Sequence, residues 1–339
     1  MAIFSIANIK LRAVSAVVPS NIESNWDLAN YSDLEKKTFI STTGIENRRI
    51  ADLGVTAADL CIQSAKKILQ ELNIDRSEID ILVFVSQTPD HTIPGSSMFI
   101  QQKLGLPNSC VALDINQGCA GYVYGLSVIS SMMSSGKLRK GLLLVGDTIT
   151  KTISPNDRSL VPIFSDAGSC TLLEFSTSTK PISFNLQTDG SGFDKIIIKG
   201  GGARTPLDDE NGCLYMNGQD IFNFGLNKVA SNINALCGEN NLDPKGINYF
   251  VMHQANMLLN ETIRKKLEIS PESTLYSLKN YGNTSCASIP VTLAANAKEI
   301  NKNVHAQILL SGFGVGLSWG SALIGVEFFK CFEIDEYRK

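Results

Sequence analysis

The sequence predicts an α/β fold, and two observations lead to this prediction. Apolar runs of strand length alternate with segments whose apolar residues recur at helical spacing. The same alternation occurs in both halves of the chain, although no sequence repeat is obvious. Because 339 residues are more than one hydrophobic core usually supports, we expect two core-forming halves, residues 1–177 and 178–339.

The first half begins its regular pattern with a helix and a strand. Residues 57–72 carry apolar side chains at helical spacing, which predicts a helix. Residues 81–85, Ile-Leu-Val-Phe-Val, form a continuous apolar run that is typical of a buried strand. The elements expected after these are a buried strand at 109–115, an apolar helix at 122–135, and strands at 141–145 and 167–175.

The second half repeats this order of elements. A helix is expected at 221–236, and a short strand at 249–252 ends directly before His253. The elements expected after these are helices at 258–267 and 287–299 and strands at 306–310 and 318–328. Between the halves, residues 189–212 are rich in Gly, Asp and Pro and predict a long connecting loop, a kind of segment that is often functional.

Composition and charge argue against several classes of protein. A net charge of −3, with 43% hydrophobic and 19% charged residues, is ordinary for a globular enzyme and does not favour nucleic-acid binding. No apolar run approaches the roughly 20 residues that span a bilayer, and no secretory signal is recognisable, so we expect a cytoplasmic protein without membrane contact. The eight cysteines form no CxxC pair, so we expect no metal site and no disulfide framework. We also expect no cofactor.

Cys119 is the most informative residue of the chain. It follows the strand expected at 109–115 and precedes the helix expected at 122–135, which places its thiol at a strand-to-helix turn. Unpaired backbone N–H groups and the positive end of the helix dipole favour an anion there and lower a thiol pKa. Free cysteines are also among the most buried residues, so this segment alone leaves a nucleophile and a packed thiol equally open.

Three further segments hold candidate functional residues. His253 follows an expected strand and precedes a helix, where α/β folds collect active-site groups, although a lone histidine is more often structural. Asn283 follows a glycine and precedes a helix, as a turn or N-cap residue does. Alternating glycines within residues 311–320 expose backbone N–H groups that could form an oxyanion hole or an anion nest.

Together these segments resemble the ketoacyl synthase III branch of the thiolase superfamily. The resemblance covers nearly the full chain, and its core is Cys119 with the segments His253-Gln254-Ala255-Asn256 and Gly282-Asn283-Thr284-Ser285. Further family motifs stand in the same order here: Thr43-Gly44-Ile45 with Arg48-Arg49-Ile50, Asp157-Arg158, and Asp189-Gly190-Ser191. The resemblance implies a five-layered αβαβα fold of two similar halves, with the nucleophile in the first half and the histidine and asparagine in the second. It also implies a homodimer.

The resemblance also implies a reaction. Cys119 would take an acyl group from an acyl-CoA or acyl-carrier-protein donor, while backbone N–H groups of Cys119 and Val315 hold the oxyanion. Malonyl-acyl-carrier protein would then lose CO2, and His253 and Asn283 would donate hydrogen bonds to the resulting enolate. This is a decarboxylative Claisen condensation of fatty-acid or related acyl-chain biosynthesis. The substrate-binding residues implied in addition are Arg158, Ile93, Phe222 and Gly314, with Ile93 bordering the acyl pocket across the dimer.

Some positions depart from the family pattern near the substrate. Thr38 stands where members that load from acyl-CoA carry a Trp, which stacks on adenine beside the arginine that Arg158 matches; this departure leaves room for an acyl-carrier donor. Val315 stands where glycine is usual and predicts a narrower acyl pocket. Asn116 and Gln117 stand where small residues are common and predict a more polar surrounding of the nucleophile.

A basic segment on the helix after His253 predicts a surface for an acidic carrier protein. Its residues are Arg264, Lys265 and Lys266. A solvated helix face explains such charges equally well, and Leu258 stands where the family often has a basic residue.

Two other functions remain open at this point. The first keeps Cys119 as the acyl acceptor but transfers the acyl group to an oxygen or nitrogen nucleophile. The second is a non-catalytic partner subunit of another synthase. The presence of both His253 and Asn283 favours condensation, because stabilising an enolate requires both donors, and the retained Cys119 disfavours the partner subunit.

Overall fold

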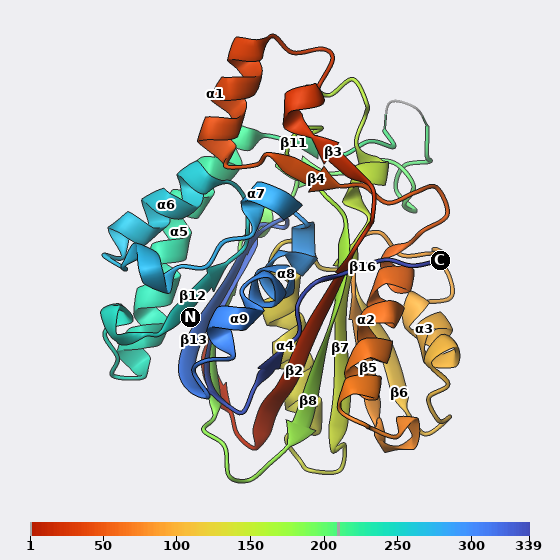
Figure 1. Cartoon of the computed structure of the whole chain (residues 1–339), viewed down its shortest axis with the longest axis vertical. Coiled ribbons are helices and arrows are strands. Elements are labelled where there is room, and N and C mark those ends of the chain that lie inside the picture. Colours follow the sequence, from red (N-terminus) through yellow and green to blue (C-terminus); the bar gives the residue numbers. More distant parts are fainter. Residues whose placement is uncertain (1, 209–210) are drawn as a thin grey trace.

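Figure 1 shows the computed structural model of the chain, which describes residues 2–208 and 211–339. Two large sheets form the centre of this described part. The seven-stranded sheet consists, in spatial order, of β15 (Lys330–Cys331), β2 (Ile9–Val18), β8 (Ala167–Phe175), β7 (Lys140–Asp147), β5 (Ile81–Val85) and β6 (Val111–Ile115), with β16 (Asp335–Glu336) also paired to β2. The five-stranded sheet consists of β1 (Ala2–Ile6), β9 (Ile182–Thr188), β14 (Ser318–Glu327), β13 (His305–Gly314) and β12 (Tyr249–Met252).

A buried layer of helices separates the two sheets. It contains α4 (Gly121–Met133), α8 (Ser288–Ala295) and α9 (Ala297–Ile300). One apolar cluster runs through this layer, joining Val83 of β5, Leu126 of α4 and Leu310 of β13. All but the last turn of α4 is covered by the two sheets, which explains why this helix carries no charged residue.

Two further pairs of helices cover the outer faces of the sheets (Figure 1). The helices α2 (Ala57–Glu71) and α3 (Ser96–Leu104) pack on the seven-stranded sheet, and α5 (Gly218–Glu239) and α6 (Met257–Lys266) pack on the five-stranded sheet. The layers therefore follow the order αβαβα, which confirms the expected fold. The helix α1 (Asp33–Thr43) lies at the upper end of the view, and the short α7 (Leu278–Tyr281) lies below it, near the antiparallel pair of β3 (Ile22–Ser24) and β4 (Asn47–Arg49).

Local sequence signals explain several of these elements. Thr56 starts α2 through a capping box, in which its hydroxyl accepts the Asp59 N–H and the Asp59 carboxylate accepts the Thr56 N–H. The strand β5 lies between the parallel strands β6 and β7, and all of its side chains are buried. Its sequence is therefore a continuous apolar run rather than an alternating one.

Most elements expected from the sequence are confirmed. The strands expected at 81–85, 167–175 and 249–252 are β5, β8 and β12. The strands expected at 141–145 and 306–310 are parts of the longer β7 and β13, and the strand expected at 318–328 is β14, which ends one residue earlier. The helices expected at 57–72, 122–135, 221–236 and 258–267 are α2, α4, α5 and α6, with ends that differ by a few residues.

Three expectations were wrong in detail. The helix expected at 287–299 is broken at Asn296, whose side-chain amide donates to the Thr292 carbonyl at the end of α8. The strand expected to be buried at 109–115 is the outermost strand β6, so Val111 is 38% exposed. Within the loop expected at 189–212, β10 (Ile196–Ile197) pairs with β11 (Tyr215–Met216). Edge position and the pairing of strands distant in the chain are tertiary properties that composition does not encode.

The expected division after residue 177 falls between β8 and β9. Each sheet also takes strands from the other half of the chain. The N-terminal strand β1 pairs with β9, and the C-terminal strands β15 and β16 pair with β2. The two-half division therefore stays a prediction about folding units.

Replacing Gly168 by alanine is expected to destabilise the fold. A Cβ at this position of β8 would lie 2.5 Å from Leu60 Cβ and 2.6 Å from the Cys61 backbone nitrogen of α2. Because the helix backbone cannot retreat cheaply, we expect Gly168→Ala to lower the free energy of unfolding by about 1–3 kcal/mol. Urea denaturation measures this change. The matched control is Gly190→Ala, whose Cβ meets nothing within 4 Å, and an equal loss in both variants would contradict the packing argument.

Candidate active site

Cys119 lies where β6 gives way to α4, at the boundary between the sheet and the buried helix layer. The end of β13 packs directly against this turn. A Cβ at Gly312 would lie 2.7 Å from Ala120 Cα, and a Cβ at Gly314 would lie 2.7 Å from Cys119 Sγ. Glycine at positions 312 and 314 is therefore required for close approach to the nucleophile turn.

The environment of the Cys119 thiol corrects one expectation. Burial raises the pKa of this thiol to about 11, although backbone N–H groups of Val315 and Cys119 hydrogen-bond to the sulfur and oppose the shift. The side chain is only 7% exposed, so the cost of removing a thiolate from water outweighs the favourable helix end. The expectation of a lowered thiol pKa was wrong, and the resting group is a neutral thiol.

His253 follows β12 and is buried. Its Nδ1 lies 2.7 Å from Ser288 Oγ at the start of α8, and its ring meets the Phe313 ring edge-on at 5.5 Å between centroids. Burial lowers the pKa of His253 to about 3, and a hydrogen bond to the Ser285 backbone opposes this shift. The imidazole is therefore neutral at physiological pH and can act as a hydrogen-bond donor but not as a cation.

Asn283 has both a turn-forming and a cavity-facing group. Its side-chain oxygen accepts the Ser285 N–H at 2.9 Å, and its backbone N–H donates to the Ile163 carbonyl at 3.0 Å. These bonds fix the side chain, while its amide NH2 group has no partner within the described residues and lies at the cavity. The expected turn role and a role as hydrogen-bond donor are thus compatible in one residue.

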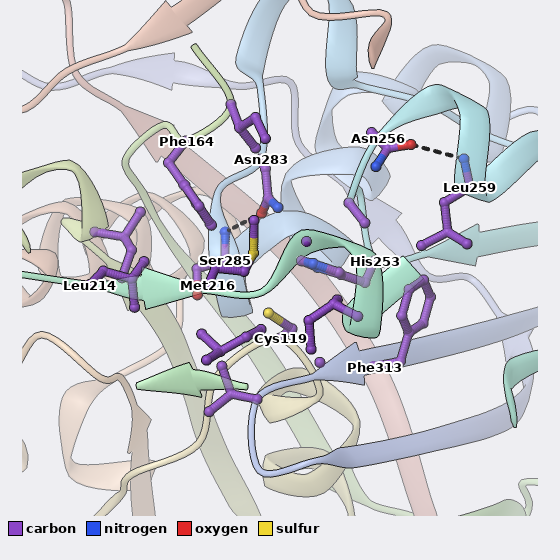
Figure 2. Close-up of a pocket in the computed structure, with 18 of the residues that line it drawn as sticks. Cys119, Phe164, Leu214, Met216, His253, Asn256, Leu259, Asn283, Ser285 and Phe313 are labelled. Atoms are coloured by element: carbon purple, nitrogen blue, oxygen red, sulfur yellow. Dashed lines mark hydrogen bonds between the residues drawn. The ribbon is translucent and has the colours of Figure 1, made fainter. Parts of the chain in front are cut away.

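These three residues line one cavity of about 150 Å³ (Figure 2). Figure 2 shows the Cys119 sulfur between His253 on one side and Met216 and Leu214 on the other, with Asn283 above. Among the residues predicted from the sequence, those that line this cavity are Cys119, His253, Asn283, Phe222, Gly314 and Val315. Chain positions far apart in the sequence therefore meet at one place.

The remaining predicted substrate residues do not line this cavity. Arg158 stacks on the Tyr31 ring, 4.7 Å from its centroid, and pairs with Glu35 at 2.8 Å. A separate surface groove contains these three residues together with Thr38. Ile93 is 84% exposed in the single chain.

The basic segment of α6 is only partly available to a partner. The Arg264 guanidinium donates to both carboxylate oxygens of Glu261 and to the Ile269 carbonyl. Lys266 Nζ donates to the Leu226 carbonyl at 3.0 Å. Lys265 is exposed. Pairing thus leaves Arg264 little capacity for a further carboxylate.

Comparison with known proteins identifies the family. The family model for 3-oxoacyl-[acyl-carrier-protein (ACP)] synthase III matches residues 113–190, and the model for its C-terminal part matches residues 237–326. The beta-ketoacyl-[acyl-carrier-protein] synthase III of Lactococcus lactis subsp. lactis is 32% identical over 323 residues, which cover 94% of this chain and 99% of that protein. The chain belongs to the ketoacyl synthase III family.

Solved structures of the ketoacyl synthase III family agree with this assignment. A 3-oxoacyl-(acyl-carrier protein) synthase from Burkholderia xenovorans LB400 superposes with a TM-score of 0.95 at 35% identity, covering 99% of both chains. The 3-oxoacyl-[acyl-carrier-protein] synthase III of Aquifex aeolicus VF5 superposes with a TM-score of 0.85 at 26% identity, covering 94% of this chain and 99% of that chain. The thiolase-like fold expected from the sequence is confirmed.

The apolar wall of the cavity was not found by sequence reasoning. Its members come from helices, strands and loops that no local pattern connects. They are Ile149, Ile163, Phe164, Ile196, Leu214, Met216, Ile221, Leu259 and Phe313. Gln87 was also missed, although a polar residue just after the buried run 81–85 is a usable signal, since strand ends collect site residues in α/β folds. In the described residues of this ketoacyl synthase III family member, no helix is long and apolar enough to cross a membrane.

The buried thiol predicts how Cys119 reacts with iodoacetamide. Because burial raises its pKa to about 11, the thiolate fraction should keep growing with pH. We expect the alkylation rate of Cys119 to rise about tenfold per pH unit from pH 7 to 9. Mass spectrometry of the peptide that contains Cys119 measures this rate, with Cys119→Ala as the control for peptide assignment. A rate that levels off below pH 8 would show a lowered pKa instead.

Proposed function

We propose that this chain catalyses the decarboxylative Claisen condensation of a Cys119-bound acyl group with malonyl-acyl-carrier protein, in fatty-acid or related acyl-chain biosynthesis. The observation that carries the proposal is the meeting of Cys119, His253 and Asn283 in one cavity of a chain that belongs to the ketoacyl synthase III family. A nucleophile and two neutral hydrogen-bond donors suit acyl transfer followed by enolate stabilisation.

In the first step, the Cys119 sulfur attacks the thioester carbonyl of an acyl-CoA or acyl-carrier-protein donor. The thiol proton passes to the sulfur of the departing donor, which leaves as a free thiol. The backbone N–H groups of Cys119 and Val315 are directed at the Cys119 sulfur, which supports a role in which they would donate to the oxyanion of the tetrahedral intermediate. Close packing of Gly314 on Cys119 keeps this part of the backbone in place.

In the second step, malonyl-acyl-carrier protein loses CO2 and the electron pair of the broken C–C bond forms an enolate. The N–H groups of His253 and Asn283 donate to the thioester oxygen as negative charge develops there. A neutral imidazole is suited to this task, because a low pKa keeps it from carrying a charge that burial would penalise. The enolate carbon then attacks acyl-Cys119, and a β-ketoacyl thioester is released. Cys119 leaves as a thiolate, which takes a proton from water to regenerate the thiol.

Substrate contacts extend this proposal beyond the nucleophile. Phe222 and Gly314 line the cavity and would contact the acyl or pantetheine chain. Arg158 would contact the donor at the surface groove, where it is already held by Tyr31 and Glu35. Exposed Lys265, with Lys266 beside it on α6, supplies positive charge for an acidic carrier protein.

The condensation is tested on intact protein by following the mass of the peptide that contains Cys119. We expect an acyl thioester donor to add its acyl mass to Cys119, and malonyl-acyl-carrier protein to remove it with release of CO2 and a product two carbons longer. Asn283→Asp keeps the oxygen that accepts the Ser285 N–H but loses the NH2 donor. We therefore expect it to load Cys119 normally and to condense about 10²–10³-fold more slowly.

Cys119→Ala is the control for this experiment, because it removes the acyl acceptor. If another residue of Cys119→Ala became acylated, Cys119 would not be the required acyl acceptor. Acyl-Cys119 that forms but is discharged only by an oxygen or nitrogen nucleophile, without CO2 loss, would support simple acyl transfer instead of condensation. A wild-type chain that never loads would support the non-catalytic partner subunit.

We also propose that the chain acts as a homodimer formed along β6. The strand is the outer edge of the seven-stranded sheet, and an unpaired edge is a template for pairing. Exposed apolar side chains gather beside it: Val111 on β6 at 38%, Met98 on the adjoining α3 at 52%, and Ile93 at 84%. A second copy would cover them and bring Ile93 toward the acyl pocket.

The eight unpaired cysteines support a reducing, cytoplasmic location.

Val111→Lys is expected to convert the dimer to a monomer, because a lysine at the first residue of β6 would be buried in the interface and could not keep its charge hydrated. Sedimentation equilibrium measures the mass of the species in solution. The matched control is Leu34→Lys, which changes a 75% exposed leucine on α1 at the other end of the molecule (Figure 1) and should leave the mass unchanged. A Val111→Lys protein with the mass of two chains would rule out this interface.

A further inference from the structure

Gln87 is a polar side chain in the mainly apolar wall of the Cys119 cavity. It lies two residues beyond the end of β5, and its backbone N–H donates to Asp147 Oδ1 at 2.8 Å. The same carboxylate oxygen accepts the hydroxyls of Ser86 and Thr88, at 3.0 and 3.1 Å, and Asp147 has no exposed surface. A buried carboxylate therefore fixes the backbone of the short segment that carries Gln87. Its side chain extends from this fixed backbone at the cavity wall.

The amide of Gln87 lies beside the nucleophile turn. A Cβ at Gly118, the residue that precedes Cys119, would lie 2.4 Å from Gln87 Oε1 and 3.1 Å from Val315 Cγ2. Gln87 and Val315 thus both press against the backbone next to the reactive sulfur. An acyl group on Cys119 would meet these two side chains within its first few carbon atoms.

The hydrogen-bonding capacity of this amide is largely unused. Gln87 Nε2 donates only to Asn116 Oδ1, at 3.4 Å, which is long for such a bond. Gln87 Oε1 accepts no hydrogen bond within the described residues, and Gln87 is half-buried. The side-chain oxygens of two other amides at the cavity are occupied, because Asn283 accepts the Ser285 N–H and Asn256 accepts the Leu259 N–H. Gln87 Oε1 is therefore an acceptor that a ligand can use.

An unpaired amide oxygen next to an alkyl chain is unfavourable, because it loses water and gains no hydrogen bond. A hydroxyl on the same chain would donate to it and remove this penalty. We propose that Gln87 makes the enzyme select acyl groups that carry a hydroxyl close to the thioester, with 3-hydroxyacyl thioesters as the class, over plain alkyl acyl groups. This inference rests on the proposed loading of Cys119 and goes beyond it by naming the acyl class.

The selection is tested with a matched pair of donors, 3-hydroxybutyryl and butyryl thioesters of the same carrier. The measured quantity is kcat/KM for loading of Cys119, read from the mass of its peptide before any malonyl-acyl-carrier protein is added. We expect the wild-type chain to load the hydroxylated donor about tenfold faster or more, since one hydrogen bond of this kind separates the two. Gln87→Met keeps the size of the side chain but removes the acceptor, and we expect it to abolish the preference.

Two further variants make the result interpretable. Gln87→Glu keeps an acceptor oxygen and should keep the preference for the hydroxylated donor even if both rates fall. Gln70→Met makes the same chemical change on the exposed face of α2, far from the cavity, and should behave as the wild type.

The outcomes separate this inference from the proposed function. Equal loading of the two donors by the wild type, or a preference that survives Gln87→Met, would overturn the role of Gln87 while leaving condensation intact. Absence of any acyl-Cys119 with either donor would overturn both. A preference present in the wild type and in Gln87→Glu, and lost only in Gln87→Met, supports the assignment.

Discussion

The contact between the Cys119 turn and the end of β13 is the constraint on which the rest of the site depends. Gly312 and Gly314 lie so close to Ala120 and Cys119 that no side chain fits between them. This contact joins the nucleophile turn, which follows a strand of one sheet, to the other sheet. The backbone N–H of His253 donates to the Ser311 carbonyl on the same strand β13, so the same contact also places His253 relative to the Cys119 sulfur.

Burial sets the electrostatics of the site. Removal of water raises the pKa of the Cys119 thiol to about 11 and lowers that of His253 to about 3, so both groups rest in their neutral forms. A dry, neutral site penalises isolated charge but strengthens each hydrogen bond to a charge that forms during reaction. The N-terminal end of the helix at Cys119 therefore stabilises an oxyanion that forms during the reaction, and it does not maintain a thiolate in the resting site.

The motifs and the regular elements were largely predictable from the chain, whereas the walls of the cavity were not. Cys119, His253 and Asn283 stand in short segments whose residue order resembles a known family, so their types and sequence positions identify them. Leu214 and Met216 reach the cavity only because β11 pairs with β10, and Gln87 only because buried Asp147 holds its backbone. Strand pairing and buried hydrogen bonds join residues far apart in the chain, and no local pattern records them.

By itself, the periodicity of the sequence determined the α/β class. Its motif order, through the resemblance to a known family, implied the αβαβα layers and the three residues proposed for catalysis. Only the tertiary structure decided the state of the Cys119 thiol, the edge position of β6 and the separation of Arg158 from the cavity. The physical reason is that ionisation and exposure depend on what surrounds a group in space. The N-terminal end of a helix favours a thiolate when water also surrounds it. At Cys119 the two sheets enclose the helix end and exclude the water that a thiolate needs.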